Sequence, residues 1–415
     1  MLTRMTVLGT TLLFFGWSSS WAQEPLAEGY LLRGKLAEGE AALKKRLIEM
    51  PTDDQARFGL GVTQFLQSFE HLGQSLYRFG LRTERSFVRP APVIRELLPQ
   101  NPNPEKLTYD LAQKILQTFV DDLTRAEATL ADVNDRDVKL SLHVALIKID
   151  PFGLDKPVNA AFLLTQNGQR QSGDLAQFVI AFDRGDVSWL RGYCHFLLAW
   201  GETLLAIDGR ELFECSAHWT FERVETPYSF LVEDRQPLDA NPNWMWNQRR
   251  IADAIATIHL LLKMPLQEPN RLMAAHGHLK SMLQMSRDMW TFYGAETDDD
   301  REWIPNPTQT GVLRVPVTSE MQKTWLATVD EAELVLDGKR LVPFWRGADP
   351  QRGINLRRVF LELKEIDIPL WIQGTAAAPF LENGETTRFA NPETLRRINE
   401  QFRGSNFIGF AFWFN

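Results

Sequence analysis

The stretch DVSWLRGYCHFLLAWGETLLAID, from Asp186 to Asp208, decides how the rest of the chain is arranged. Apolar residues recur in it at alternating spacings of three and four, on two neighbouring faces of a helix. One face carries Leu190, Cys194, Leu197, Gly201 and Leu204, and the other carries Trp189, Tyr193, Phe196 and Trp200. Two adjoining apolar faces leave little surface for water, so the pattern predicts a central helix that other elements cover on most sides.

A thin polar line remains on this helix, made of Arg191, His195 and Glu202. At about 100° per residue these side chains lie within about 40° of one another. The loop before the helix adds Asp183 and Asp186. Because burial raises a carboxyl pKa and a nearby cation stabilises charge, Asp183, Asp186, His195 and Glu202 are candidate catalytic acids and bases. The alternative is structural: Asp186 caps the helix, and the polar line pairs with a neighbouring helix.

The beginning of the chain predicts export from the cytoplasm. Arg4 precedes an apolar segment from Met5 to Trp17, and Ser20-Trp21-Ala22 has the small-x-small form of a cleavage site. We therefore expect a signal peptide at residues 1–22 and a secreted or periplasmic mature protein; an uncleaved anchor or a buried helix is the alternative. No later stretch supplies the roughly 18 uncharged apolar residues of a transmembrane segment.

The formal net charge of −8 disfavours nucleic acid and anionic lipid surfaces as partners, because both require a basic surface. Cys194 and Cys215 are the only cysteines. In an oxidising compartment they either form a disulfide or remain buried thiols.

Residues 23–82 carry a repeated pattern. Three pairs of residues are separated by a period of 34, namely Ala27 and Gly61, Gly39 and Gly73, and Leu43 and Tyr77. This region resembles a pair of tetratricopeptide (TPR) units. Tyr30 stands at an aromatic position of the repeat and Pro51 at a helix-terminating position. Gln64 and Arg46 depart from the pattern, which has an aromatic and a small residue at their positions. The resemblance is confined to this region and implies a helical groove near Tyr30, Gln64 and Tyr77 that binds a peptide; a generic helical hairpin is the alternative.

The remaining sequence predicts a mainly α fold with a small β element. We expect a connector and a helix starting at Asn103-Pro104 (83–135), a central helical body with a β insertion (136–311), and a C-terminal helical and mixed region (312–415). In the insertion, alternation from Val138 to Leu146 predicts a strand, which pairs with a second run from Gln177 to Phe182, and His143 is expected to be exposed. The C-terminal region should hold a capping box at Ser319, a strand at residues 366–372 and a buried terminal segment.

Two further groups of residues are candidates for binding metal ions. His276 and His278 accompany several methionines, a combination that suits copper, although they point about 200° apart on a helix. Asp298, Asp300 and Glu302 alternate in a loop and could contact calcium; a solvated acidic loop is the alternative.

The sequence contains no G-x-S-x-G, H-E-x-x-H or P-loop motif. We therefore expect a non-enzymatic binding or scaffold protein of the cell envelope, without a cofactor, that engages a peptide or protein partner through a helical groove. The alternatives are an envelope hydrolase with paired carboxylates and an envelope metal-binding protein.

Overall fold

The structure is a computed structural model that describes residues 25–82, 99–159, 178–233, 244–347, 349, 351–402 and 407–414, apart from the side chains of residues 244–250 and 408. The predicted signal peptide lies outside these ranges. Most described residues are helical and the sheets are small, so the predicted mainly α fold is confirmed. No helix in these ranges is both long enough and apolar enough to cross a bilayer.

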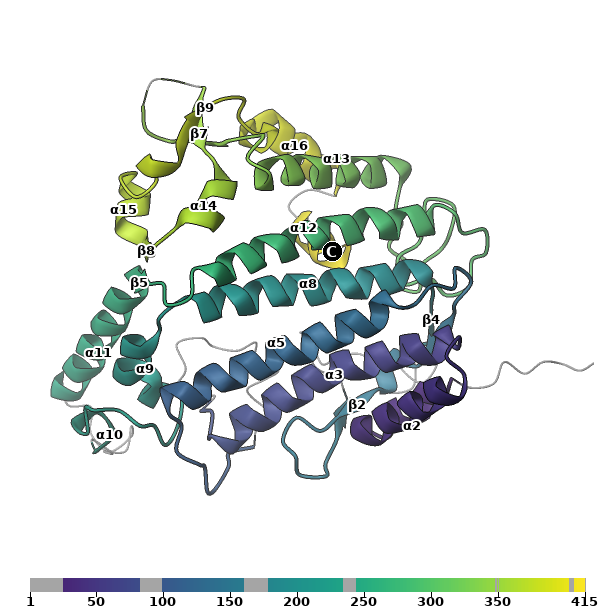
Figure 1. Cartoon of the computed structure of the whole chain (residues 1–415), viewed down its shortest axis with the longest axis horizontal. Helices are drawn as coiled ribbons and strands as arrows, with labels where there is room; N and C mark the ends of the chain where they lie inside the picture. Colours follow the sequence, from purple (N-terminus) through teal and green to yellow (C-terminus); the bar gives the residue numbers. More distant parts are fainter. Residues whose placement is uncertain are drawn as a thin grey trace, which may run out of the picture.

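The long helices lie side by side in one stack (Figure 1). From one side of the stack to the other they are α2 (Leu36–Glu49), α3 (Asp54–Arg78), α5 (Tyr109–Ala131), α8 (Arg184–Ala206), α12 (Asn270–Tyr293) and α13 (Ser319–Leu336).

The predicted central helix is α8, which packs between α5 and α12. Its first apolar face is buried at Leu190, Cys194 and Gly201. Trp200 and Leu204 are 57% and 49% exposed, however, so the two apolar faces of α8 are not covered along their whole length.

The N-terminal region consists of helical hairpins. The short helix α1 (Leu26–Leu31) packs on both α2 and α3. Residues 54–78 form one uninterrupted helix, α3, whose N-cap Asp53 accepts a hydrogen bond from the backbone of Ala56. Helical hairpins agree with both interpretations of this region, so the TPR resemblance remains a prediction.

The β insertion is present but smaller than predicted. β1 (Leu140–Leu142) pairs antiparallel with β4 (Ile180–Phe182), and the predicted pairing of these two runs is thus confirmed. After β1 the chain leaves the strand, because Glu28 accepts hydrogen bonds from the backbone and the ring of His143. His143 is therefore half-buried and paired, and its predicted exposure is wrong. A second pair joins β2 (Lys148–Ile149) to β3 (Val158–Asn159).

One predicted helix start is wrong, and one predicted capping residue is off by one position. The helix expected at Asn103-Pro104 begins later, as α5, because Thr108 accepts the capping hydrogen bond from Leu111. The cap of α13 is Thr318 rather than Ser319, and Thr318 accepts a hydrogen bond from the backbone of Met321. In both cases a threonine whose hydroxyl is free to reach the first turn supplies the cap.

The C-terminal region covers α12 with α13 and a small mixed lobe. The strand predicted at residues 366–372 is mostly helix, because Asp367 caps a helix that Pro369 favours in its first turn. The terminal segment is the helix α17, with Phe410 and Phe414 buried. The elements here are β6 (Val342–Pro343), β7 (Arg352–Ile354), α14 (Leu356–Glu362), β8 (Glu365–Asp367), α15 (Ile368–Gln373), β9 (Leu381–Asn383), α16 (Pro392–Gln401) and α17 (Phe407–Phe414).

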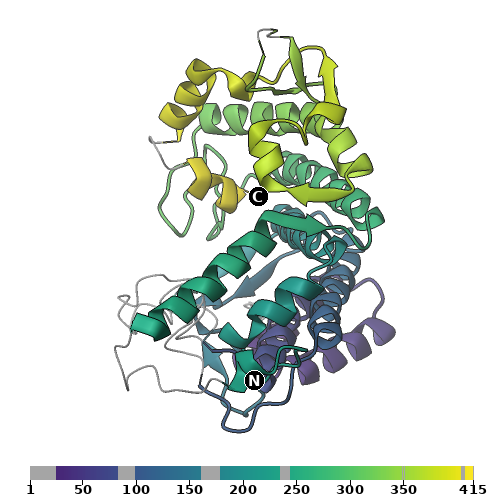
Figure 2. The same ribbon diagram turned by 90° about the vertical axis from the view of Figure 1, so that its left-hand side faces the viewer.

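One outer edge of the molecule is built from shorter elements. The structure has α9 (Arg210–Ser216), α10 (Phe230–Glu233), α11 (Trp244–Leu262) and β5 (Lys263–Pro265) at this edge. β5 pairs with β8 and so links α11 to the C-terminal lobe. Figure 2 views the molecule from this side, and α11 crosses the face nearest the viewer.

Candidate functional site

The polar line on α8 pairs with the neighbouring helices. Arg191 Nη2 lies 2.7 Å and His195 Nε2 3.4 Å from Glu127 Oε1 on α5. Nδ1 of His195 also lies 3.1 Å from Nδ1 of His278 on α12. Burial by itself raises the pKa of Glu127, but the hydrogen bonds and charges of His195 and Arg191 outweigh it and bring that pKa to about 2. The contacts among Glu127, Arg191, His195 and His278 therefore connect α5, α8 and α12.

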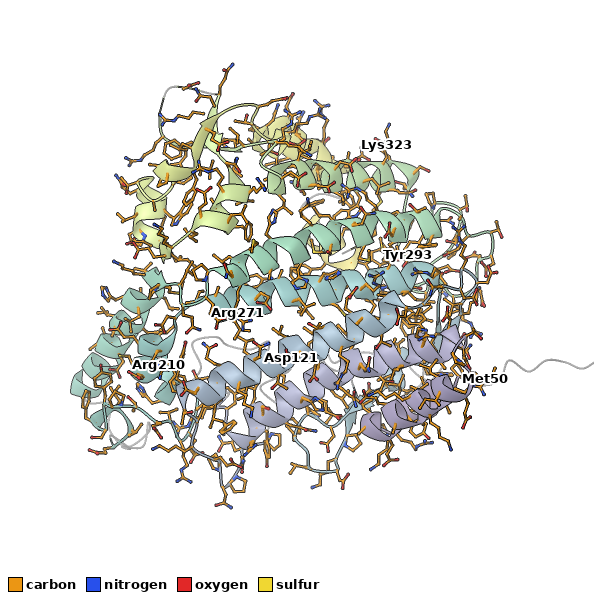
Figure 3. All side chains as sticks on the ribbon, viewed as in Figure 1. Met50, Asp121, Arg210, Arg271, Tyr293 and Lys323 are labelled. Atoms are coloured by element: carbon orange, nitrogen blue, oxygen red, sulfur yellow. The ribbon has the colours of Figure 1, made fainter. Side chains whose placement is uncertain are left out.

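Glu202 does not join the other predicted carboxylates. Arg271 on α12 donates a 2.9 Å hydrogen bond to it, and the same arginine also contacts Glu268 and Gln117. Sixteen residues of helix, about 24 Å, separate Asp186 from Glu202. Figure 3 shows Arg271 and Tyr293 at opposite ends of α12, close to these two separate sites.

Asp183 and Asp186 form the first turn of α8. Asp183, not Asp186, is the N-cap: it accepts hydrogen bonds from the backbone of Gly185 and Asp186, and Asp186 accepts one from the backbone of Asp183. The hydroxyl of Tyr293 donates a 2.6 Å hydrogen bond to Asp186. This reciprocal capping box accounts for both aspartates.

Asp183 also belongs to a cluster of acidic side chains that sequence reasoning missed. One carboxylate oxygen each from Asp183, Glu296 and Glu302 lies within 4.8 Å of the other two. Glu302 is buried rather than solvated, so the loop after α12 brings acidic groups to the N-terminus of α8. Oxygen donors at this spacing suit a hard divalent cation such as Ca²⁺.

The acidic cluster holds protons more tightly than isolated carboxyl groups do. Burial, the hydrogen bond to Asp183 and the charge of Asp183 raise the pKa of Glu296 to about 9. Burial raises the pKa of Glu302 to about 7, and the charge of Asp183 adds to that effect. At neutral pH, Asp183 and Glu296 therefore share a proton.

The residues predicted to line an N-terminal groove lie apart. Gln64 is buried in α3, where it donates a hydrogen bond to Glu40 and accepts one from Thr129. Tyr30 packs under the guanidinium of Arg33. Tyr77 lies thirteen residues, about 20 Å, further along α3 than Gln64. The three side chains thus do not meet on one surface.

The predicted metal ligands also have separate partners. The ring of His276 is buried and contacts the carbonyl oxygen of Leu336 at 2.8 Å, whereas His278 contacts His195. Cys194 and Cys215 are free thiols, so the disulfide does not form in this structure. Burial raises the pKa of both thiols, which disfavours their reactive thiolate form.

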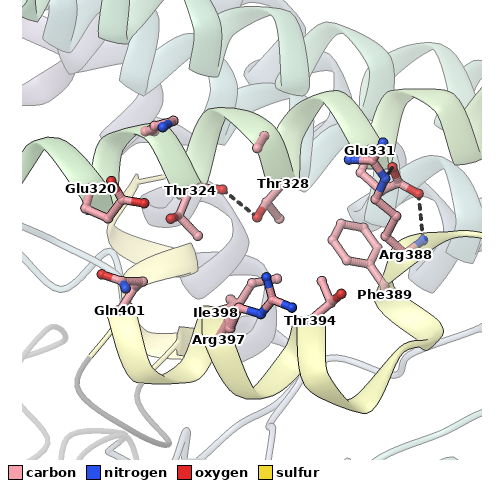
Figure 4. Close-up of a pocket in the computed structure, with 12 residues that line it drawn as sticks. Glu320, Thr324, Thr328, Glu331, Arg388, Phe389, Thr394, Arg397, Ile398 and Gln401 are labelled. Atoms are coloured by element: carbon pink, nitrogen blue, oxygen red, sulfur yellow. Dashed lines mark hydrogen bonds and ion pairs between the residues drawn. The ribbon is translucent and has the colours of Figure 1, made fainter.

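The structure contains a cavity of about 330 Å³ between α13 and α16, whose lining mixes charged, hydroxyl and apolar side chains (Figure 4). Arg397 extends from α16 into the space between the helices, and Arg388 lies at one end, beside Phe389. Glu331 is buried and already accepts hydrogen bonds from the hydroxyl of Thr387 and the backbone of Arg388. The other lining residues are Glu320, Lys323, Thr324, Ala327, Thr328, Thr394, Ile398 and Gln401.

A second cavity, of about 300 Å³, lies on the adjoining face of α13 and is almost entirely apolar. Its walls come from α8, α12, α13 and α17, and they are lined by Tyr193, Phe196, Met282, Leu283, Trp325, Thr328, Val329, Ala332, Phe407, Ala411 and Phe412.

Thr328 lines both cavities. Both spaces therefore reach α13 at this residue, and we call them together the α13 groove. One half is lined by hydroxyl groups and by charged groups of both signs, and the other by aromatic and aliphatic groups. Tyr193 adds a hydroxyl to the apolar half; burial raises its pKa to about 12, and no described residue accepts its hydrogen bond.

No pattern in the sequence indicated the α13 groove. Its residues come mainly from five helices, α8, α12, α13, α16 and α17, and each helix shows only ordinary amphipathic spacing. Comparison with protein-family models, curated proteins and solved structures finds no match to this chain. Its function is therefore inferred from the geometry of its own residues.

Proposed function

We propose that this chain is a non-enzymatic binding protein of the cell envelope that holds a segment of a protein partner in the α13 groove. The observation that carries this proposal is the position of Thr328, which lines both a cavity with charged groups and an apolar cavity. Concave sites of this size that combine apolar walls with a few polar groups are typical of ligand binding. The signal peptide predicted at residues 1–22 supports the envelope location.

The two halves define the chemistry of the bound segment. The apolar half accepts a large aliphatic or aromatic side chain, which Trp325 and Phe407 would contact. The charged half accepts a carboxylate, because three cations, Lys323, Arg388 and Arg397, line it against two acids, of which Glu331 is already satisfied by other donors. A segment with an apolar anchor and a nearby acidic residue fits both halves.

A non-enzymatic role agrees with the state of the candidate catalytic residues. Glu202 and His195 are engaged in contacts between helices. Asp183 and Asp186 are buried in the capping box of α8. Each of these groups already has a structural partner, so binding is better supported than catalysis.

The proposal can be tested by selecting short random peptides on the purified mature chain. We expect the enriched peptides to combine a large apolar residue with Asp or Glu. Ala332→Trp fills the apolar half and should weaken binding of the selected peptides by about tenfold or more. Arg397→Glu reverses a charge in the other half, so it should also weaken peptide binding. This loss should be larger at low salt than at high salt, because salt screens charges.

Ala274→Trp is the matched control, because Ala274 is an exposed alanine on α12 outside the groove. This variant should bind the selected peptides like the parent chain. If no peptide is enriched, or if Ala332→Trp and Ala274→Trp bind equally well, the proposed function is wrong.

A further inference from the structure

Two histidine rings meet at the contact between α8 and α12, which lie side by side in Figure 1. Nδ1 of His195 on α8 is 3.1 Å from Nδ1 of His278 on α12, and the centroids of the two rings are 5.3 Å apart. Each ring therefore presents one nitrogen to the other. At this distance one Nδ1 donates a hydrogen bond and the other accepts it, so the contact holds one proton.

The charged groups around this pair come from all three helices that meet here. Nε2 of His195 is 3.4 Å from Oε1 of Glu127 on α5, and Arg191 on α8 lies 2.7 Å from the same oxygen. The charges of His195 and Glu127 also act on His278. Among the described residues, α13 and α14 pack on α12 as well, but they add no charge that acts on this ring.

The contact between the two rings tolerates one positive charge but not two. When a single imidazole is charged, the neutral ring still accepts the hydrogen bond. When both are charged, each Nδ1 carries a hydrogen, no acceptor remains, and two like charges face each other. Burial and the charge of His195 lower the pKa of His278, against the opposing charge of Glu127. The second proton therefore binds only below the ordinary histidine value of 6.5.

The histidine pair lies next to the apolar cavity of the α13 groove in both helices. Tyr193 and Phe196, on either side of His195 along α8, line that cavity. Met282, one helical turn after His278 on α12, lines it as well. The contact between the rings thus ties together two of the helices that form the cavity walls. Loss of the contact removes a link between these walls.

We propose that His195 and His278 form a pH-sensitive contact that holds the apolar half of the α13 groove closed around its ligand at neutral pH and releases the ligand in acid. This inference rests on the proposed function, because it concerns regulation of the same groove. Since the pKa of His278 is lower in the folded chain than its ordinary value of 6.5, its contribution to the contact is complete above pH 6.5. That contribution is lost as the pH falls below this value.

Hydrogen exchange of the ligand-free chain, followed by mass spectrometry, tests the contact without any peptide. His278→Asn is the informative variant, because an asparagine amide can form a hydrogen bond near the position of Nδ1 but cannot become charged. At pH 5, residues 193–196 and 279–283 should exchange several-fold faster in the parent chain than in this variant. At pH 7.5 the two chains should exchange alike. Comparison at a single pH removes the effect of pH on the chemistry of exchange.

Binding of the selected peptides gives the second readout. The parent chain should bind them about tenfold more weakly at pH 5 than at pH 7.5, whereas His278→Asn should lose less than about twofold. His259→Asn is the matched control, because His259 is an exposed histidine on α11, outside the pair. This control should follow the parent chain in both measurements.

Equal exchange of the parent chain and His278→Asn at pH 5 would overturn the inference, whether or not peptides bind. An equal loss of peptide affinity in these two chains would overturn the regulation of the groove. If the difference in exchange is found but neither chain binds a peptide, the proposed function fails and the pH-sensitive contact stands.

Discussion

The hydroxyl of Tyr293 donates a 2.6 Å hydrogen bond to Oδ1 of Asp186, and both side chains are buried. This contact ties the end of α12 to the first turn of α8, where a Cβ atom on Gly185 would lie only 2.3 Å from the tyrosine ring. The two central helices therefore meet closely at the place where the acidic cluster forms.

Replacing Tyr293 by Phe should destabilise the fold. The substitution leaves Oδ1 of the buried Asp186 without the donor that Tyr293 supplies, which costs about 1–3 kcal/mol in the free energy of unfolding. Tyr193→Phe is the control: its hydroxyl has no acceptor among the described residues, so the change should stay within about 0.5 kcal/mol. Urea unfolding measures both, and equal effects would show that the hydrogen bond to Asp186 contributes nothing.

The acidic cluster predicts that stability falls as pH rises. The pKa of Glu296 is about 9 in the folded chain, against an ordinary value of 4.5. Between these values the folded state keeps a proton that the unfolded chain has released. The contribution of Glu296 to stability is therefore complete below pH 4.5, and it is lost as the pH rises to about 9.

Glu296→Gln keeps an uncharged hydrogen-bonding group at every pH. We expect this variant to flatten the dependence of the free energy of unfolding on pH, and to be more stable than the parent chain near pH 9. Glu211→Gln, at an exposed position, should leave the dependence unchanged. A parent chain whose stability rises through this range would contradict the shared proton.

Two glycines within helices should respond in opposite directions to the same substitution. A Cβ atom on Gly201 would lie 2.5 Å from Cγ2 of Val120, so Gly201→Ala should push α8 from α5 and cost about 1–3 kcal/mol. A Cβ atom on Gly277 meets nothing within 4 Å. Gly277→Ala should therefore stabilise α12 by up to about 1 kcal/mol. Thermal unfolding of the two variants checks this, and a shift in the same direction would contradict the close packing of α5 on α8.

The sequence correctly predicted those helices and strands whose hydrophobic pattern lies within one short stretch of residues. The apolar periodicity around Leu190 and Cys194 gave the central helix, and the alternation after Val138 gave a strand with the correct partner. The predicted ends of helices and strands were wrong where another side chain forms a hydrogen bond with the backbone at that position. Thr108 caps α5 later than Asn103 would, and Glu28, distant in sequence, draws His143 out of the strand.

The candidate sites could not be predicted because they depend on which helices meet. Glu296 and Glu302 belong to an acidic loop in the sequence, and only the fold places them against Asp183. In the sequence, Lys323 and Arg397 have the spacing of ordinary surface residues. Only the packing of α16 beside α13 brings them to the same cavity. His195 and His278 likewise lie far apart in the sequence, and only the packing of α8 on α12 brings their rings together.

The most direct test of the central claim is photo-crosslinking from the junction of the α13 groove. A photoreactive amino acid at Thr328, in the full chain within its own cells, should form a light-dependent adduct with one polypeptide, and Arg397→Glu should remove that adduct. The same amino acid at Ala274 should give none. No adduct at Thr328, or the same adduct from both positions, would contradict the account.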